Sequence, residues 1–226
     1  GSEMCIRDRY LLYHIVWQFA LYFWKKQEKT AMEQSNFYAM MSRMKYINRW
    51  GLMNNTKYEN LSEHSLQVAM IAHCLVLIHN KKFGGNLNAE RASILAIFHD
   101  TTEIITGDMP TPIKYFNNTI KDAYKEIENA AADRLCSLLP EDCIRDREEI
   151  IKQSGKDDLN LKRFVKAADR FSALIKCIEE LRMGNEEFRE AKNGIEKSIS
   201  DMNMPEADVF TNEFLPAFSL SLDEMQ

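Results

Sequence analysis

The stretch Ile94-Leu-Ala-Ile-Phe-His-Asp-Thr-Thr-Glu103 decides both the fold class and the chemistry of this chain. Its first five residues are apolar and predict a buried helix that carries His99 and Asp100 at its end. An imidazole and a carboxylate are costly to bury unless a partner satisfies them, and a divalent cation satisfies both. Glu103 follows His99 by four residues, on nearly the same helix face, so it is placed to act on a group that the ion holds.

A His-Asp pair also arises often by chance, and the plain alternative is a capped helix end with solvated polar side chains. Neighbouring helical residues point about 100° apart, so one ion between them must be closed by ligands from elsewhere in the chain. The case for a metal site therefore depends on the rest of the sequence.

The composition favours helices. The chain has 226 residues, enough for one large domain or a domain with an extension, and 45% of them are hydrophobic. Glycine (8) and proline (5) are scarce and methionine (12) is plentiful, as in helical proteins. A net charge of −5 argues against binding to a nucleic-acid polymer. The five cysteines form no Cys-x-x-Cys motif, which predicts a reducing cytoplasm and argues against a zinc–thiolate site.

Residues 1–34 differ from the rest and are predicted to be an N-terminal extension to a domain over 35–226. Gly1-Ser2 resembles a tag-cleavage remnant, and 10–24 form an apolar, aromatic segment with basic residues on both sides. This segment is shorter than the roughly 20 apolar residues of a membrane span. Three interpretations remain open: an extra helix that packs on this or a neighbouring chain, a disordered or artefactual extension, and a membrane-surface anchor.

From Ser35 onward a helical period dominates. A first helix is expected to end near Trp50-Gly51, with the glycine as its C-terminal cap. Asn60, with Glu63 three residues later, resembles a capping box for the next helix, and Asn88 is expected to cap a helix that runs to about Thr106. Further helices are predicted over 119–139, 141–153, 159–183 and 186–202, with a short one from Pro205, and no strand pattern of useful length occurs.

Two more candidate ligands complete the expected metal site. His64 opens the helix after Asn60, and Asp169 lies in a largely apolar run where an unpaired carboxylate is expensive. Two imidazoles and two carboxylates without thiolates suit Mn²⁺, Co²⁺, Fe²⁺ or Mg²⁺, and leave positions for water and a substrate oxygen. The alternatives are a solvated His64 and an ion pair of Asp169 with a neighbouring Lys or Arg.

The spaced set His64, His99-Asp100 and Asp169 resembles the H…HD…D signature of the HD-domain metal-dependent phosphohydrolases. Longer motifs resemble the bacterial HD-domain 5′-deoxynucleotidases over about residues 34–224. These motifs are Ile47-Asn-Arg-Trp50, Glu59-Asn-Leu-Ser-Glu-His-Ser-Leu-Gln-Val-Ala69, Lys82-Phe-Gly-Gly-Asn86, Thr106-Gly-Asp-Met-Pro-Thr-Pro-Ile-Lys-Tyr-Phe116 and Leu220-Ser-Leu-Asp-Glu224.

The resemblance implies an all-α, homodimeric HD-domain helical bundle that removes phosphate from deoxyribonucleoside 5′-monophosphates with a divalent metal ion. His64, His99, Asp100 and Asp169 would hold the ion, and His64 and Asp169 would also face the substrate. Glu103 would be the acid–base residue.

The resemblance also implies substrate contacts. Arg49 would clamp the phosphate and Trp50 would wall the sugar. Asp108 would accept a sugar hydroxyl, and Met109, Pro110 and Thr111 would line the sugar pocket. Without the resemblance, Arg49 is a surface residue at a helix end, Trp50 is ordinary core packing, and 108–112 is a proline-stiffened turn.

Other functions stay open at this point. Another HD phosphohydrolase, acting on nucleoside triphosphates, cyclic nucleotides or guanosine tetraphosphate, fits the metal set, although the compact chain and Arg49-Trp50 count against it. A metal-bound nucleotide sensor without turnover needs no proton-transfer carboxylate, so Glu103 argues against that class. A membrane-tethered scaffold built on residues 10–24 is the remaining alternative.

Overall fold

The computed structural model describes residues 35–114, 116–140, 149–156 and 158–225. The chain divides into two compact units, Gly1–Gln34 and Ser35–Gln226. The helix expected within 10–24 and the start of the helix expected at 141 lie outside the described residues.

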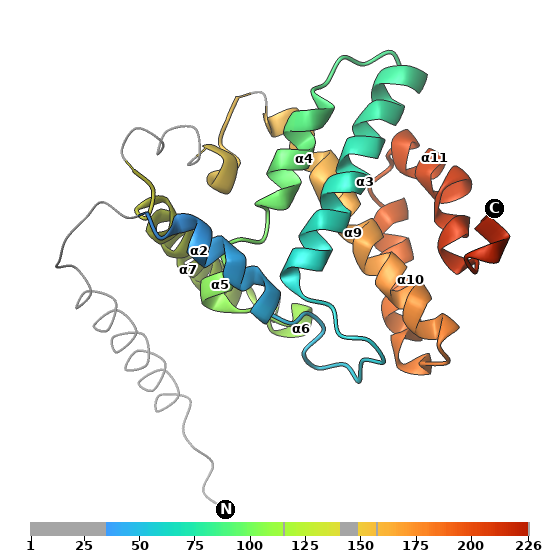
Figure 1. Cartoon of the computed structure of the whole chain (residues 1–226), viewed down its shortest axis with the longest axis horizontal. Coiled ribbons are helices and arrows are strands. Elements are labelled where there is room, and N and C mark those ends of the chain that lie inside the picture. Colours follow the sequence, from blue (N-terminus) through green and yellow to red (C-terminus); the bar gives the residue numbers. More distant parts are fainter. Residues whose placement is uncertain (1–34, 115, 141–148, 157, 226) are drawn as a thin grey trace, which may run out of the picture. The chain divides into compact units, whose positions relative to one another are not determined.

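The described part of the chain is helical and contains no strand, which confirms the predicted all-α class (Figure 1). An isolated antiparallel bridge joins Asn48 to Asn60. The α-helices are α2 (Phe37–Met41), α3 (Leu61–Lys82), α4 (Ala89–Ile97), α5 (Glu103–Thr106), α6 (Thr111–Lys114), α7 (Asn118–Cys136), α9 (Asp158–Arg182), α10 (Arg189–Ser200) and α11 (Pro205–Glu213). Short 3-10 segments cover Ser42–Tyr46, Glu186–Phe188, Leu215–Ser219 and Asp223–Met225.

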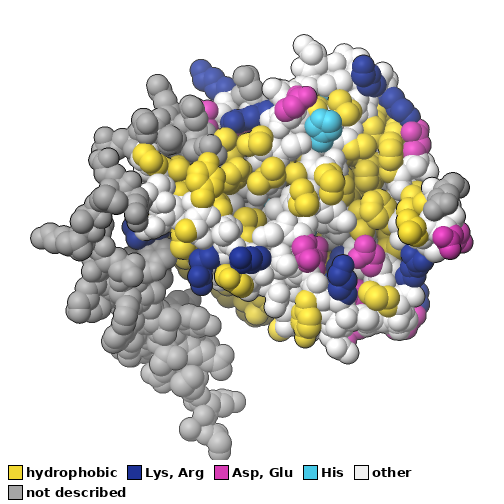
Figure 2. Space-filling view, viewed as in Figure 1, with side chains coloured by type: hydrophobic (Ala, Val, Ile, Leu, Met, Phe, Trp, Pro, Cys, Tyr) yellow, Lys and Arg dark blue, Asp and Glu magenta, His cyan; other side chains and the backbone are white. Residues whose placement is uncertain are grey.

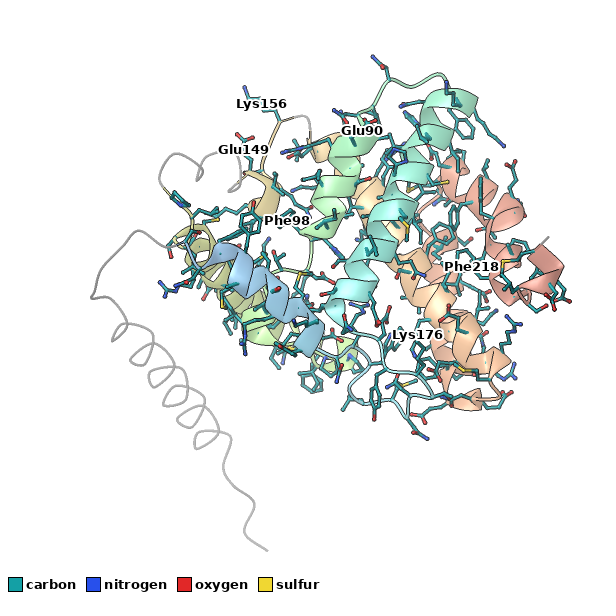
Figure 3. All side chains as sticks on the ribbon, viewed as in Figure 1. Glu90, Phe98, Glu149, Lys156, Lys176 and Phe218 are labelled. Carbon is teal, nitrogen blue, oxygen red and sulfur yellow. The ribbon has the colours of Figure 1, made fainter. Side chains whose placement is uncertain are left out.

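Helices α3, α4 and α9 pack together as the centre of the bundle, and α10 and α11 cover one side of it (Figure 1). Their shared core is built on fully buried side chains such as Leu75, Phe164 and Phe171. A second, smaller cluster joins α2 to α7 around Phe37 and Leu135, and Phe98, labelled in Figure 3, packs against it from the end of α4. The core therefore fixes α3, α4 and α9 side by side.

Helix α3 is long and apolar enough to cross a membrane by length and composition, as the one such helix among the described residues. Its apolar window is 56% buried within the protein, against α4, α9 and α11. This burial is that of the central helix of a helical bundle.

The two predicted caps are confirmed. The Asn60 side chain accepts hydrogen bonds from the backbone N–H groups of Ser62 and Glu63, and the Glu63 carboxylate accepts from the Asn60 N–H, which completes the capping box of α3. The Asn88 side chain accepts from the Arg91 N–H and caps α4. Each cap fixes where a site-bearing helix begins.

Two predicted helix ends are wrong. The first helix ends at Tyr46, because Asn48 leaves it to form the bridge with Asn60, so Gly51 caps nothing there. Trp50 instead adopts a left-handed backbone conformation with φ of 59°.

The helix expected over 88–106 stops at Ile97 and resumes as α5 at Glu103. Between them the Thr101 hydroxyl and backbone N–H both donate to the Phe98 carbonyl, which replaces the helical hydrogen-bond pattern with a turn. His99 and Asp100 lie in this turn, so the premise that His99 and Glu103 share one continuous helix is also wrong.

Candidate active site

Three elements bring the four predicted metal ligands together. His64 lies in the first turn of α3, His99 and Asp100 lie in the turn after α4, and Asp169 lies midway along α9. The Nε2 atom of His64 is 3.1 Å from Asp169 Oδ1, and the Nε2 atom of His99 is 3.1 Å from Asp100 Oδ2. The two rings are 5.3 Å apart between centroids. His64 is fully buried, which removes the alternative of a solvated helix start.

The residues present fit a divalent cation. Each of the four side chains offers a ligand atom, and these atoms all lie within 4.8 Å of one another. The Nε2 atoms of both histidines are buried and have no hydrogen-bond partner among the described residues, although both point toward the carboxylates. A cation accepts these two lone pairs and neutralises the two carboxylates together.

Electrostatics at the cluster reflect this crowding of charge. Burial alone would raise the pKa of Asp169, but His64 and His99 outweigh it and hold that pKa well below its usual range. Burial alone would lower the pKa of His99, but Asp100 and Asp169 raise it well above its usual value. Both carboxylates are therefore ionised and attract positive charge.

Arg49 and Trp50 lie beside the cluster and share a buried carboxylate. The Arg49 guanidinium donates to Asp100 through Nη1 at 3.3 Å, and its Nε is 3.5 Å from Glu59 Oε2. The Trp50 indole N–H donates to the same Glu59 oxygen at 2.8 Å, and its ring packs on Phe188. The Arg49 side chain is only 13% exposed, so it is part of the cluster and not a surface residue.

Glu103 lies at the start of α5 and is almost fully buried. Its Oε2 atom has no hydrogen-bond partner among the described residues. Burial raises the pKa of Glu103 to about 9, and the negative charges of Asp100 and Asp108 add to this effect. A buried carboxyl group whose oxygen has no hydrogen-bond partner, next to side chains that could hold a metal ion, is suited to proton transfer.

The loop after α5 contributes the remaining predicted residues. Asp108, Met109 and Pro110 are all partly exposed, and the Asp108 charge acts on Glu103. Thr111 begins α6, and its side chain lies outside the described part of the structure. The fold thus places this loop close to the cluster, and the described side chains of Asp108, Met109 and Pro110 make no hydrogen bond to the four cluster residues.

Sequence reasoning gave no role to three residues that contact the cluster. Glu59 touches Arg49, Trp50 and His64, and its carboxylate is only 12% exposed. Ser172 and Gln67 lie on the far side of the His64 ring. Glu59 and Gln67 lie in the motif from Glu59 to Ala69 that resembles the 5′-deoxynucleotidases, but the sequence of a motif does not show which residues its polar side chains contact.

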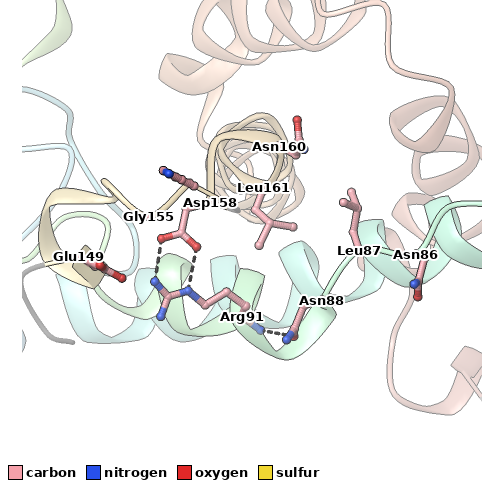
Figure 4. A pocket seen from close by; sticks show the side chains of 10 residues that line it. Asn86, Leu87, Asn88, Arg91, Glu149, Gly155, Asp158, Asn160 and Leu161 are labelled. Carbon is pink, nitrogen blue, oxygen red and sulfur yellow. Dashed lines mark hydrogen bonds and ion pairs between the residues drawn. The ribbon is translucent and has the colours of Figure 1, made fainter.

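Two cavities differ in what lines them. A cavity of about 300 Å³ is lined by His99, Asp100 and Glu103 together with residues of α7, of the segment 151–153 and of the start of α9. A larger one, of about 680 Å³, lies between the start of α4 and the start of α9. There Arg91 and Asp158 form a bidentate ion pair (Figure 4), so these two opposite charges in its lining are paired with each other. The smaller cavity is the one that meets the reactive side chains.

Comparison with known proteins gives a consistent result. A family model described as 5′-deoxynucleotidase YfbR-like matches residues 36–218. A protein of Vibrio vulnificus named 5′-deoxynucleotidase VV1113 is 49% identical over 195 residues, which cover 86% of this chain and 100% of that protein.

Two solved structures share the fold. An HD-domain phosphohydrolase from Listeria innocua superposes with a TM-score of 0.69 at 21% identity, covering 81% of this chain and 88% of that one. The HD phosphohydrolase of cyanophage S-2L superposes with a TM-score of 0.57 at 18% identity, covering 80% of this chain and 95% of that one. The latter structure is described as bound to dA and one catalytic Zn²⁺ ion.

Proposed function

Because the chain belongs to the YfbR-like 5′-deoxynucleotidase family, we propose that its cluster of two imidazoles and two carboxylates is where it removes phosphate from deoxyribonucleoside 5′-monophosphates. The observation that carries this proposal is the pair of buried Nε2 atoms, on His64 and His99, which face two carboxylates and lack hydrogen-bond partners among the described residues.

His64, His99, Asp100 and Asp169 would hold one divalent ion. When bound, such an ion supplies Lewis acidity toward a phosphate oxygen and an attacking water. The donor set without thiolates suits Mn²⁺, Co²⁺, Mg²⁺ or Fe²⁺. The cyanophage protein is described as bound to one catalytic Zn²⁺ ion, which supports including Zn²⁺ among the ions to be tested.

Arg49 would bind the phosphate. Its guanidinium already lies at the edge of the cluster, 3.3 Å from Asp100, and a phosphate beside the ion offers it two oxygens in the geometry that its fork prefers. The contact between Trp50 and Glu59 holds the neighbouring indole in place, so that it would form one wall of the sugar site.

Glu103 would transfer the proton. From its position at the edge of the cluster it can orient the attacking water or protonate the leaving 5′-oxygen. Asp108 would accept a sugar hydroxyl, and Met109, Pro110 and Thr111 would line the sugar site. His64 and Asp169 would face the substrate as well as the ion.

We also propose that the enzyme is a homodimer. Three apolar side chains of α3 are exposed at spacings that place them on one stripe, namely Leu66, Met70 and Leu77, and Ile94 and Ile97 of α4 are exposed too. Figure 2 shows hydrophobic side chains gathered in a band across one face of the described unit. A second copy related by a two-fold axis covers such a stripe with itself.

The oligomeric state is tested by light scattering after size exclusion. Met70→Glu should convert the dimer to a monomer, while Leu222→Glu, which changes an exposed apolar residue near the C-terminus, should leave it dimeric. A wild-type monomer would contradict the proposal.

A cytoplasmic location is the remaining part of the proposal. Cys74 and Cys177 are free thiols, which accords with a reducing compartment. Cell fractionation with detection of the native protein tests this directly.

The function itself is tested by phosphate release. The metal-stripped protein is given Mn²⁺, Co²⁺, Mg²⁺ or Zn²⁺ and a panel of deoxy- and ribonucleoside mono- and triphosphates. We expect turnover of deoxyribonucleoside monophosphates only after metal is restored. Faster hydrolysis of triphosphates, or metal and nucleotide binding without turnover, would favour the other HD phosphohydrolases or the sensor instead.

A further inference from the structure

The imidazoles of His64 and His99, in the proposed metal site, differ in the partner of their Nδ1 atom. The Nδ1 atom of His99 is 2.7 Å from the carbonyl oxygen of Ala96. A carbonyl only accepts, so this Nδ1 carries a proton, and the neutral imidazole that binds a cation keeps its lone pair on Nε2. The Nδ1 atom of His64 instead lies 3.0 Å from the Ser172 hydroxyl, which can donate or accept. The tautomer of His64 therefore depends on what Ser172 does with its own hydrogen.

Gln67 decides the direction of that hydrogen bond. The Ser172 hydroxyl donates to Gln67 Oε1 at 2.6 Å. A hydroxyl has one hydrogen, so once it is given to Gln67 the oxygen can only accept from His64. The Glu59 carboxylate, 3.7 Å from His64 Nδ1, adds a negative charge that favours a proton on the same nitrogen.

The opposite side of the His64 ring agrees with this direction. Its Nε2 atom is 3.1 Å from Asp169 Oδ1 but makes no hydrogen bond to it, since Nε2 has no such partner among the described residues. An N–H at this position would be expected to align with the carboxylate. A lone pair directed between Asp100 and Asp169 is the arrangement that a cation requires.

We infer that Ser172 and Gln67 are positioning residues that hold the proton of His64 on Nδ1 and so reserve Nε2 for the metal ion. The inference rests on the proposed role of His64 as a ligand. Gln67 follows His64 by three residues on α3, and Ser172 follows Asp169 by three on α9, so the relay also ties together the two long helices that carry ligands. The backbone fixes the tautomer of His99, whereas the tautomer of His64 depends on side chains and can therefore be changed by mutation.

The test compares two serine deletions of the same size. Ser172→Ala removes the acceptor of the His64 proton. Ser65→Ala removes a hydroxyl that is equally buried, stands next to His64 and has no hydrogen-bond partner among the described residues. Affinity for Mn²⁺ is measured by competition with a chelator. Ser172→Ala should bind Mn²⁺ about 10- to 100-fold more weakly, the usual effect of losing such a partner, while Ser65→Ala should bind as wild type does.

Gln67 gives an independent comparison that does not disturb the core, since this side chain is only partly buried. Gln67→Glu keeps an oxygen that accepts from Ser172 and should retain Mn²⁺ affinity. Gln67→Leu keeps the approximate volume without an acceptor and should lose affinity in the same direction as Ser172→Ala. Nitrogen NMR of the metal-free chain should show the His64 proton on Nδ1 in the wild type and a mixture of tautomers in Gln67→Leu.

The outcomes separate the two proposals. If His64→Ala binds Mn²⁺ as tightly as wild type, the proposed metal site is wrong and the inference falls with it. If His64→Ala loses Mn²⁺ while Ser172→Ala and Gln67→Leu keep it, the metal site stands and the relay is overturned. A wild-type spectrum with the His64 proton on Nε2 also overturns the relay.

Discussion

Asp100 is the side chain on which contacts of the cluster converge. Its Oδ2 atom lies 3.1 Å from His99, 3.3 Å from Arg49 and 3.6 Å from His64. A single carboxylate thus joins both imidazoles and the proposed phosphate clamp. Removal of the Asp100 carboxylate is therefore expected to disrupt the metal site and the phosphate site together.

We predict that Asp100→Ala or His64→Ala abolishes both bound metal and turnover, because the loss of one ligand from four weakens a site that already keeps open positions. Elemental analysis of the purified variants checks this. Asp133→Ala, which changes a largely exposed carboxylate on α7, is the control and should keep its metal. A full metal load in inactive Asp100→Ala would contradict the prediction.

Replacement of Glu103 tests its proposed role in proton transfer. We predict that Glu103→Gln keeps the metal and binds substrate but loses about 10²- to 10⁴-fold in kcat, as expected when a general acid–base group is replaced by an amide. Steady-state kinetics with a metal assay on the same sample checks this. Near wild-type kcat would show that Glu103 supports the site without transferring a proton.

Trp50 is held by an indole hydrogen bond to Glu59 and by packing on Phe188, and it sits in a left-handed backbone conformation. A non-glycine residue persists there only where its surroundings hold it. We predict that Trp50→Ala raises kcat/KM for adenosine monophosphate relative to deoxyadenosine monophosphate and lowers deoxy activity, because the wall that would exclude the 2′-hydroxyl is gone.

The control for this prediction is Trp50→Phe, which keeps a ring but not the N–H donor to Glu59. Its ratio of kcat/KM for the two substrates should fall between those of the wild type and Trp50→Ala. An unchanged ratio in folded, metal-loaded Trp50→Ala would exclude Trp50 from sugar selection. The loop from Asp108 to Pro112 would then be the next candidate.

At the scale of elements, the sequence predicts what is decided locally. Asn60 and Asn88 cap their helices through their own side chains and the next few N–H groups, so a short window contains all the information. The break at Ile97 is different. The apolar pattern predicts a continuous helix, but the hydroxyl of Thr101 bonds to the Phe98 carbonyl and a turn places His99 and Asp100 beside the other cluster residues. Its reason lies partly in α3 and α9, far away in sequence.

The support of the loop between Gly51 and Tyr58 is a second feature that the sequence alone could not predict. Glu180 of α9 is fully buried and accepts hydrogen bonds from the backbone N–H groups of Thr56 and Lys57 and from the Lys176 ammonium. Lys176, labelled in Figure 3, also donates to the Lys57 carbonyl. The loop between the Arg49-Trp50 pair and His64 is thus anchored to a ligand-bearing helix.

We predict that Glu180→Gln lowers the free energy of unfolding by about 3–5 kcal/mol, because it leaves the buried Lys176 ammonium without its counter-charge. Chemical denaturation measures this. Glu187→Gln is the matched control, since the Glu187 carboxylate is exposed and accepts one hydrogen bond from the same loop; its effect should stay within about 0.5 kcal/mol. Equal effects of the two changes would contradict the anchoring role.

The same carboxylate gives a pH dependence. Burial alone would raise the pKa of Glu180, but Lys176, Asn185 and two backbone N–H groups outweigh it and lower that pKa from 4.5 to about 2. A lowered pKa means that the unfolded chain binds this proton more readily, so the stabilisation is present above about pH 4.5 and is lost as pH falls toward 2. The difference in unfolding free energy between wild type and Glu180→Gln should shrink across this window. A difference that stays constant from pH 5 to pH 2 would disprove the assignment.

At the scale of the whole molecule, the proposed active-site residues all lie within the second unit, between Arg49 and Asp169. We predict that deletion of residues 1–34 leaves phosphatase activity intact. Kinetics and light scattering of the shortened chain check this. A folded, dimeric protein that no longer turns over substrate would show that the extension contributes to the site.

The all-α class and the family were accessible from sequence, because periodicity and motif spacing are properties of the chain itself. The four side chains of the proposed metal site could be selected for the same reason, and the structure brings them together. Ser172 and Gln67 were not, since their roles arise only when α9 lies against α3 and brings Ser172 to the ring of His64, more than 100 residues away in sequence. Glu59 is close in sequence to Arg49, Trp50 and His64, but its contacts to them depend on the chain folding back at the bridge between Asn48 and Asn60.

The bridge between Asn48 and Asn60 has one further consequence. The Arg49 N–H donates to the Glu59 carbonyl and the Leu61 N–H to the Ile47 carbonyl, so the loop is closed at its base by backbone bonds on both sides. This closure holds Arg49 and Glu59 at the base of the loop. Leu52 is 69% exposed there, and each doubling of loop length costs only about 0.6 kcal/mol in closure entropy. This tip is therefore a natural place to graft a reporter peptide or an affinity handle into a working enzyme.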